Sequence, residues 1–395
     1  MRSSFLKHSV FLLGYRTRSL QLGSIGGGWA RGLAGQADVY GGGGHAATKY
    51  IYDTNTGDKV HTNDLDLWYN TNGVVAIDGK TSSFWQCENY HQIWDFGVKD
   101  RNEPGLPSYT AAATMAMARL NPSRPSVDIV QFLAELRDAP RMIFQIGDLL
   151  RRMTQASRAG RSFRPTAKDY ASGYLGWTFG WDPLISDLRK LFNWSEHVNK
   201  RMSDLQRLKS GRLVKETTTF HVKYKESWGG HYGGPLYQAQ TIFALESEIE
   251  VRQWVSVRYV PTNATLRLLD GDMYALARSL VYGHQPDWST VWELMPWSWL
   301  IDWFTTAGDF FAANRNHLHL RLDDVSVMTY RSARPLRAYG TTNPHGARFR
   351  VANADVAYHK QRRWGWNVPT VTAKEPFLSL KQWSILSALA VMRHR

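Results

Sequence analysis

Apolar residues recur at two different spacings along this 395-residue chain. In some stretches they recur every two residues, which is typical of β-strands, and in others every three to four residues, which is typical of α-helices. The strand-like spacing covers residues 1–110, 213–262 and 318–370, and the helix-like spacing covers residues 111–212, 263–317 and 371–395. Nothing repeats at the period of roughly 20–50 residues that a solenoid needs. We therefore predict an α+β fold in an elongated two-region molecule. One region is an antiparallel β-sheet, the other is a helical bundle, and each is discontinuous in sequence.

Two turns are predicted in the first β stretch. Residues 48–61 indicate a hairpin that turns at Gly57, and residues 73–79 indicate a second turn at Asp78-Gly79. The segment from Gly73 to Thr81 also resembles a phosphate-binding P-loop. However, five residues instead of four separate its glycines, and those residues are strand-like, so we favour the hairpin.

A long amphipathic helix is predicted between Asp182 and Leu208. Asp182 followed by Pro183 is typical of a helix start, because aspartate caps the first turn and proline fits the first helical position. Arg189, Lys200 and Arg207 would share the face opposite the apolar stripe, flanked by Lys190 and Arg201. This basic ridge could equally be the solvated face that any surface helix needs.

The charge balance favours a polyanionic partner. The chain has 48 Lys and Arg against 34 Asp and Glu, and residues 124–215 alone hold 17 basic against nine acidic residues. A second basic stretch, residues 330–363, holds eight basic residues and one acid. The 17 Trp, 18 Tyr and 16 Phe could stack on nucleic-acid bases, although most of the Trp more simply fill a core. The candidate RNA phosphate contacts are Arg151, Arg152, Arg158, Arg161, Arg164, Lys168, Arg189, Lys190, Lys200, Arg201, Arg207, Lys209 and Arg212.

Several other kinds of function have little support in the sequence. Cys87 is the single cysteine, so neither an internal disulfide nor a multi-cysteine zinc site can form. His317 and His319 would lie on one side of a strand near Asp323 and Asp324, but surface polar residues explain them better than a metal site. We expect no cofactor and no catalytic residue. Since no apolar stretch reaches the roughly 20 residues that span a bilayer, we also expect no membrane insertion.

Four segments together resemble the maturation, or attachment, proteins of the single-stranded RNA bacteriophages. They are residues 121–137, residues 179–187, residues 292–309 with the Trp-Glu-Leu and Asp-Trp-Phe sequences, and residues 376–389. The resemblance implies a virion protein, present as one copy per particle, that binds the packaged genomic RNA through its helical region. It also implies a place in the coat protein shell and a β region that faces a host pilus.

The residues that carry the resemblance are expected to be architectural. Their roles would be to start the long helix and to join helices through aromatic packing. They are Asp182, Pro183, Trp292, Glu293, Pro296, Trp299, Asp302, Trp303 and Phe304.

Two other functions remain open at this point. Asp302 and Asp309 lie seven residues apart on one helix face, so they could serve a metal-dependent nuclease. A cellular basic RNA-binding protein without a virion would also fit the charge, although not the four-part resemblance.

Overall fold

The structure is a computed structural model. It describes residues 15–32, 39–53, 64–82, 85–95, 103–126, 151–152, 154–155, 158, 166–230, 242–283, 287–295, 297–342, 345–353, 356–374 and 378–393. The fold is α+β, with helices and an antiparallel sheet in separate parts of the chain. No helix in this part of the chain is long and apolar enough to cross a membrane.

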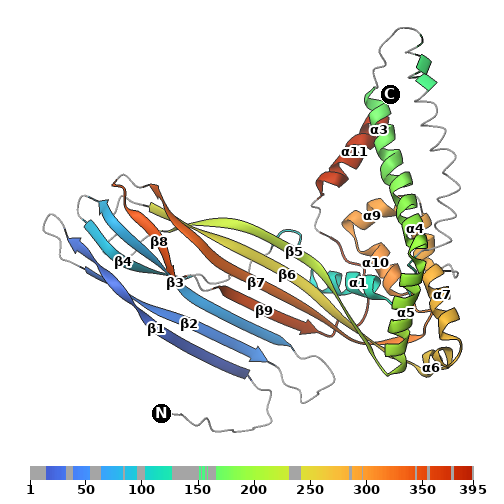
Figure 1. Ribbon diagram of the computed structural model, residues 1–395, viewed down its shortest axis with the longest axis horizontal. Helices are drawn as coiled ribbons and strands as arrows, with labels where there is room; N and C mark the ends of the chain where they lie inside the picture. The colour runs from blue at the N-terminus through green and yellow to red at the C-terminus, as the bar shows by residue number, and fades with distance from the viewer. Residues whose placement is uncertain are drawn as a thin grey trace. The chain divides into compact units, whose positions relative to one another are not determined.

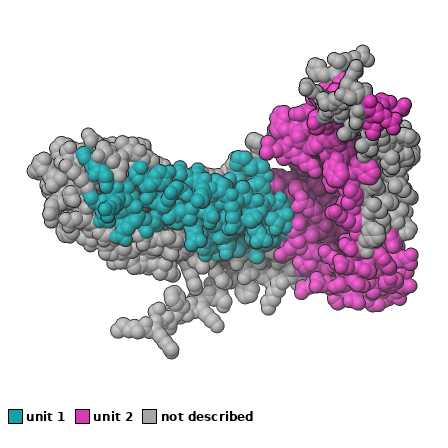
Figure 2. All heavy atoms as spheres, turned by 45° about the horizontal axis from the view of Figure 1, so that its top comes forward, with its two compact units in different colours: residues 1–106, 218–255, 326–365 teal, residues 107–217, 256–325, 366–395 magenta. Residues whose placement is uncertain are grey.

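The chain divides into two compact units (Figure 2). The β unit comprises residues 1–106, 218–255 and 326–365, and the helical unit comprises residues 107–217, 256–325 and 366–395. The chain passes between the units at five points, after residues 106, 217, 255, 325 and 365. The spacing of apolar residues predicted changes of structure after residues 110, 212, 262, 317 and 370.

Nine strands in the described ranges form one sheet with the order β2-β1-β4-β3-β9-β7-β6-β5, and β8 pairs with β3 (Figure 1). The β1–β2, β2–β3, β3–β4, β3–β9 and β7–β9 pairs are antiparallel. The strands are β1 (Tyr15–Gly32), β2 (Val39–Asp53), β3 (Leu65–Ser82), β4 (Trp85–Asp95), β5 (Leu213–Gly230), β6 (Ile242–Pro261), β7 (Leu320–Thr342), β8 (Arg348–Asn353) and β9 (Ala357–Trp364).

The second turn predicted in the first β stretch is wrong. β3 continues through Asp78 and Gly79, and the chain reverses only after Ser82, which lies opposite Trp85 of β4. Gly79 has a φ of 101° at an irregularity in the β3–β4 register, so its backbone freedom serves a bulge. The first predicted turn, at Gly57, lies outside the described residues, although β2 and β3 do pair, with Asp53 opposite Leu65.

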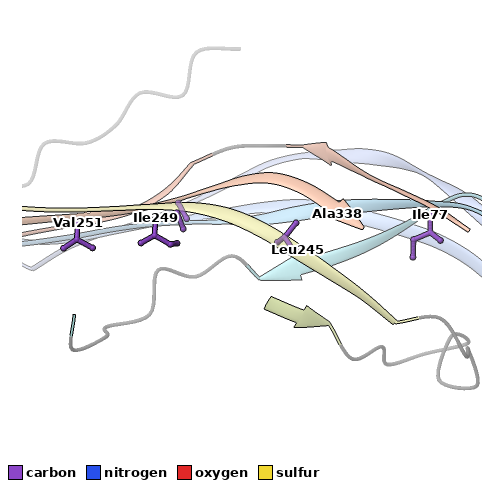
Figure 3. Close-up of a cluster of buried hydrophobic side chains, with 7 residues drawn as sticks. Ile77, Leu245, Ile249, Val251 and Ala338 are labelled. Atoms are coloured by element: carbon purple, nitrogen blue, oxygen red, sulfur yellow. The ribbon is translucent and has the colours of Figure 1, made fainter. Parts of the chain in front are cut away.

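Alternation along β6 builds the core of the β unit. Leu245, Ile249 and Val251 are buried and lie at even separations, so they share one face of the strand. They cluster with Ile77 of β3 and with Ala333, Ala338 and Ala357 of β7 and β9 (Figure 3). Strands that are far apart in sequence therefore share one apolar cluster.

The helical unit is assembled from helices that pack in pairs. α1 lies against α10, α5 against α7, and α3 against α11. The helices are α1 (Tyr109–Leu120), α3 (Ala167–Gly176), α4 (Asp182–Phe192), α5 (Trp194–Lys209), α6 (Asn263–Asp270), α7 (Met273–Tyr282), α8 (Trp288–Leu294), α9 (Ser298–Phe304), α10 (Ala307–Ala313) and α11 (Leu380–Arg393), with the π-helix η1 (Trp177–Trp181) between α3 and α4.

The predicted start of the long helix at Asp182 is wrong. α3, η1 and α4 follow one another directly, as the green rod in Figure 1 shows, and Asp182 has helical φ and ψ angles. Its N–H donates to the Trp177 carbonyl, five residues back, which is π-type bonding. Because Pro183 has no N–H to donate, a wider turn at this point lets the helix pass a proline that would otherwise interrupt it.

The predicted continuous helix from Leu184 to Leu208 is also divided. It ends at Phe192, and α5 begins at Trp194 after a single residue, Asn193. The actual helical start lies at Thr166, whose side chain accepts a hydrogen bond from the Asp169 N–H, while the Asp169 side chain accepts one from the Thr166 N–H. This capping box sits 16 residues before the start that the proline suggested.

Candidate nucleic-acid interface

The α4 and α5 helices present exposed cations. Arg189 lies on α4 and Lys200 and Arg207 lie on α5, and all three are exposed. Within the described residues, none of the three forms an ion pair with a carboxylate. Lys190 is different, because its Nζ lies 2.6 Å from Asp187 Oδ1, one turn earlier on the same helix. Arg189, Lys200 and Arg207 therefore remain available to a polyanion.

Most of the other predicted phosphate contacts are also on the surface. Arg151, Arg152, Arg158, Lys168, Lys209 and Arg212 are exposed. Arg161 and Arg164 lie outside the described residues. Within the described ranges, two of these exposed cations have carboxylate partners: Arg152 lies 2.8 Å from Asp169, and Lys209 lies 3.0 Å from Asp270.

Hydrogen bonds hold Asp169 in its charged form. Its carboxylate accepts from the backbone N–H and the hydroxyl of Thr166 at 2.8 Å each, and from Arg152. These bonds, the Thr166 backbone bond first, lower the pKa of Asp169. Arg152 thus helps to fix the first turn of α3, and part of its charge is already balanced.

Arg201 does not belong to the exposed ridge. The structure buries this residue, and its guanidinium donates to the backbone carbonyls of Pro122 and Arg124. Burial lowers the pKa of Arg201, and the nearby charge of Asp204 raises it. Helical spacing predicted Arg201 beside Lys200, but it could not show that another segment covers that edge of the helix. The prediction that Arg201 flanks an exposed basic ridge is therefore wrong, whereas its role as a phosphate contact stays a prediction.

A cavity of about 310 Å³ opens beside Arg201 within the helical unit. Its walls come from the end of α1, the turn after it, α4, α5 and the start of β5. Three cations outside the predicted set line it, namely Arg119, Arg124 and Lys215. Arg124 and Lys215 are the first and last residues of the basic stretch 124–215, and Arg119 and Arg124 flank the Asn121-Pro122-Ser123 sequence of the first resembling segment. These were the signals that could have drawn attention to them.

Residues 132–395 match the family described as phage maturation protein, and these residues make up more than half of the chain. The chain belongs to the phage maturation protein family. It is 28% identical over 228 residues to maturation protein A2 of Escherichia virus Qbeta, an alignment that covers 52% of this chain and 49% of that protein. It is 24% identical over 214 residues to maturation protein A2 of Qbeta virus (strain MX1), covering 49% and 47%. The chain thus spans about half the length of the curated relatives it matches.

Membership of the maturation protein family assigns the chain to the virion of a bacteriophage. The matched range contains all of the second, third and fourth resembling segments. Of the first segment, residues 121–137, it contains only residues 132–137. The family resemblance seen in the sequence is therefore confirmed.

The tryptophan-rich segment of this maturation protein packs helices together. Trp299 of α9 lies 5.0 Å from Phe179 of η1 and 4.9 Å from Trp303, measured between ring centroids. Trp292 of α8 lies 5.2 Å from Phe311 of α10. These contacts fit the architectural role that we expected.

Other residues that carry the family resemblance are exposed or only partly described. Asp182, Glu293 and Phe304 are exposed, and Pro296 lies outside the described residues. For Pro183 the structure describes the backbone alone. The architectural role of these residues stays a prediction.

The acids proposed for a nuclease are engaged in structural contacts. The two carboxylate oxygens of Asp302 accept hydrogen bonds from Trp292 and from the backbone of Gly308, and Asp309 lies 3.7 Å from Lys374.

His317 and His319 precede β7 and do not share a strand face, so the expectation that they lie on one side of a strand is wrong. His317 lies 3.3 Å from Asp287. Among the described residues, no three His, Cys, Asp or Glu side chains form a group that could hold a metal ion.

Proposed function

We propose that this maturation protein binds the packaged single-stranded genomic RNA through its helical unit, occupies one position in the coat protein shell, and adsorbs to a host pilus through its β unit. The observation that carries the RNA part is the set of exposed cations on α4 and α5 that form no ion pair with a carboxylate in the described part of the chain. Family membership supports the shell and pilus parts.

The helical unit suits a folded RNA better than a single-stranded segment with a fixed sequence. Helices of RNA expose phosphates and 2′-hydroxyls, whereas their deep major groove hides most base edges from side chains. Arginine and lysine on stiff α-helices can follow such a surface without reading its sequence. Recognition would then depend mainly on RNA shape and on salt concentration.

A charge-reversal experiment tests the RNA part. The triple variant Arg189→Glu, Lys200→Glu, Arg207→Glu should bind RNA purified from the phage particles more weakly. Filter binding over a range of salt concentrations should give a flatter log–log plot, by about 0.7–0.9 unit for each phosphate contact that is lost. An unchanged slope would remove these helices from the interface.

The β unit supplies a matched control. Arg334, Arg348 and Lys360 are exposed in the second basic stretch, so Arg334→Glu, Arg348→Glu, Lys360→Glu makes the same change of charge. We expect this variant to keep the salt dependence of the native protein. If it alone flattens the plot, the β unit holds the RNA and the proposed division of roles is reversed.

Adsorption can be tested on particles. Leu336 and Tyr339 are exposed on β7, and both belong to the β unit. Particles that carry Leu336→Ser and Tyr339→Ser should contain RNA in normal amounts and adsorb poorly to host cells. Loss of packaged RNA with intact adsorption would contradict this assignment.

A further inference from the structure

The cavity beside Arg201 has an unusually one-sided charge. Among the described residues that line it, six are Lys or Arg and Asp204 is the one carboxylate. The apolar side chain of Pro125 is an exception in an otherwise polar lining. Sites for drug-like molecules are mostly apolar with a few polar groups, so this lining is suited to a small anion instead.

The charges in the cavity are only partly compensated. Asp204 accepts a hydrogen bond from Lys215, and Lys190 pairs with Asp187. Arg201 is held by two carbonyl groups that carry no net charge. Burial lowers the pKa of Lys215, the bond to Asp204 raises it, and the charges of Arg201 and Lys200 lower it further. The positive groups here destabilise one another, and a bound anion would relieve that repulsion.

Two further cations stand at the opening. Arg124 and Lys200 are exposed, and neither forms an ion pair with a carboxylate among the residues that the structure describes. They come from the turn after α1 and from α5, which are about 75 residues apart in sequence. The fold brings both to the lining of one cavity.

The wall formed by residues 121–126 is fixed before any ligand arrives. The Asn121 side-chain amide donates to the carbonyls of Ala312, Ala313 and Arg315, and its Oδ1 accepts from the Ser123 N–H at 2.9 Å. The Ser126 N–H donates to the Val281 carbonyl at 3.1 Å. Together with the two bonds from Arg201, these contacts hold the turn in one conformation, which lowers the cost of ordering a site on binding.

We propose that this cavity binds a single phosphate group of the RNA backbone and so fixes where the RNA sits on the protein. The inference rests on the proposed function. Guanidinium and ammonium donors from several directions match the oxygens of a phosphate. A volume of about 310 Å³ equals the liquid volume of about ten waters, which leaves room for the adjoining ribose. Cations on an open helix face hold RNA in many registers, whereas an enclosed phosphate selects one.

The test combines a cavity variant with a matched control. Arg124→Ala, Lys200→Ala removes two exposed cations at the opening, and Arg267→Ala, Arg278→Ala removes two exposed cations on α6 and α7 that do not line the cavity. Because all four side chains are exposed, both variants should fold, which circular dichroism checks. The full chain is used throughout.

The first arm uses RNA purified from the phage particles and ethylated at random phosphates. For the native protein, ethylation at one or a few phosphates should block binding. The cavity variant should lose that pattern and bind about tenfold more weakly or worse, because two hydrogen bonds to a charged group are missing. The control variant should keep the pattern.

The second arm uses inorganic phosphate as the probe, with chloride at the same ionic strength as reference. Phosphate should raise the melting temperature of the native and control proteins more than that of the cavity variant. If phosphate raises the melting temperatures of the native protein and the cavity variant equally, the cavity does not hold the anion and the proposal is overturned.

The outcomes separate the two proposals. If RNA binds and the same phosphates remain sensitive in the cavity variant, the cavity proposal is overturned and the proposed function stands. If the native protein binds no RNA, the proposed function fails and with it the assignment to the RNA backbone. Stabilisation by inorganic phosphate in that case would identify a site for the free anion, which also contradicts the backbone assignment.

Discussion

The indole Nε1 of Trp292 donates a hydrogen bond to Oδ2 of Asp302 at 3.1 Å. Oδ1 of the same carboxylate accepts from the Gly308 N–H at 2.7 Å, and Lys374 Nζ donates to the Asp302 carbonyl at 2.9 Å. One aspartate thus joins α8, α9, α10 and the segment before α11. These bonds explain in physical terms why an acid lies between tryptophans in the most specific part of the family resemblance.

Replacing Asp302 by asparagine should destabilise the protein by about 1–3 kcal/mol, because an amide has one acceptor oxygen for two donors and turns its NH₂ toward an N–H group. Urea denaturation measures the loss. Asp309→Asn is the matched control and should cost less than about 1 kcal/mol, since Asp309 and Lys374 form a partly exposed pair. Metal-dependent cleavage of labelled RNA that Asp302→Asn abolishes would instead support the nuclease.

Gly308→Ala should destabilise by about 1–3 kcal/mol, since a Cβ at this position would lie 2.5 Å from Asp302 Oδ2. The clash involves the carboxylate directly, so the cost should shrink when Asp302 is already alanine. A double-mutant cycle by chemical denaturation measures this coupling. Equal costs in both backgrounds would show that the carboxylate is not what restricts Gly308.

Asp204→Asn should destabilise by about 3 kcal/mol or more, because it leaves the mostly buried ammonium of Lys215 without its countercharge. The double variant Asp204→Leu, Lys215→Met should be less harmful, since it removes both charges together. Thermal denaturation of the two proteins gives the comparison. A double variant less stable than Asp204→Asn would contradict this account of the pair.

The β unit should lose stability in acid partly through Glu246. Arg337 lies 2.7 Å from its carboxylate and Lys225 lies 3.3 Å away, and the Arg337 hydrogen bond is the main cause that lowers the pKa of Glu246 from 4.5. A carboxylate whose pKa is lower in the folded state stabilises above its unfolded pKa, and this stabilisation disappears as the pH falls through the folded pKa.

Glu246→Gln should therefore lower the melting temperature at pH 7 and have progressively less effect below pH 4.5. Thermal denaturation at a series of pH values measures both effects. Glu248→Gln, two residues along β6, is the control, because Glu248 forms no ion pair in the described part of the chain. A difference that stays constant down to pH 2 would rule out an ionic origin.

Local spacing predicted several elements well. Met273–Tyr282 is helical and ends at Gly283, whose φ of 58° suits a glycine after the last turn. β5 and β6 lie in a stretch where apolar residues recur every two residues, and α11 lies in a stretch where they recur every three to four residues. Such patterns are reliable because a strand or helix that buries one face must repeat its own period.

Proline and glycine were poor predictors of where helices start and where the chain turns. Pro183 suggests a helix start, yet the π-type turn before it lets the helical run pass through. Gly79 suggests a turn, yet it forms a bulge within β3. Both residues mark unusual backbone, but whether the chain turns there depends on which segments pair with it.

The sequence by itself determined the α+β class, the excess of positive charge in the helical stretches and the family. Tertiary structure alone decided which positive charges are available. Arg201 and Lys200 are neighbours with the same charge, but Arg201 donates to carbonyls nearly 80 residues earlier in the chain while Lys200 stays exposed. Periodicity reports only which face of a helix a residue occupies, whereas burial and the cavity depend on segments that come together after the chain has folded.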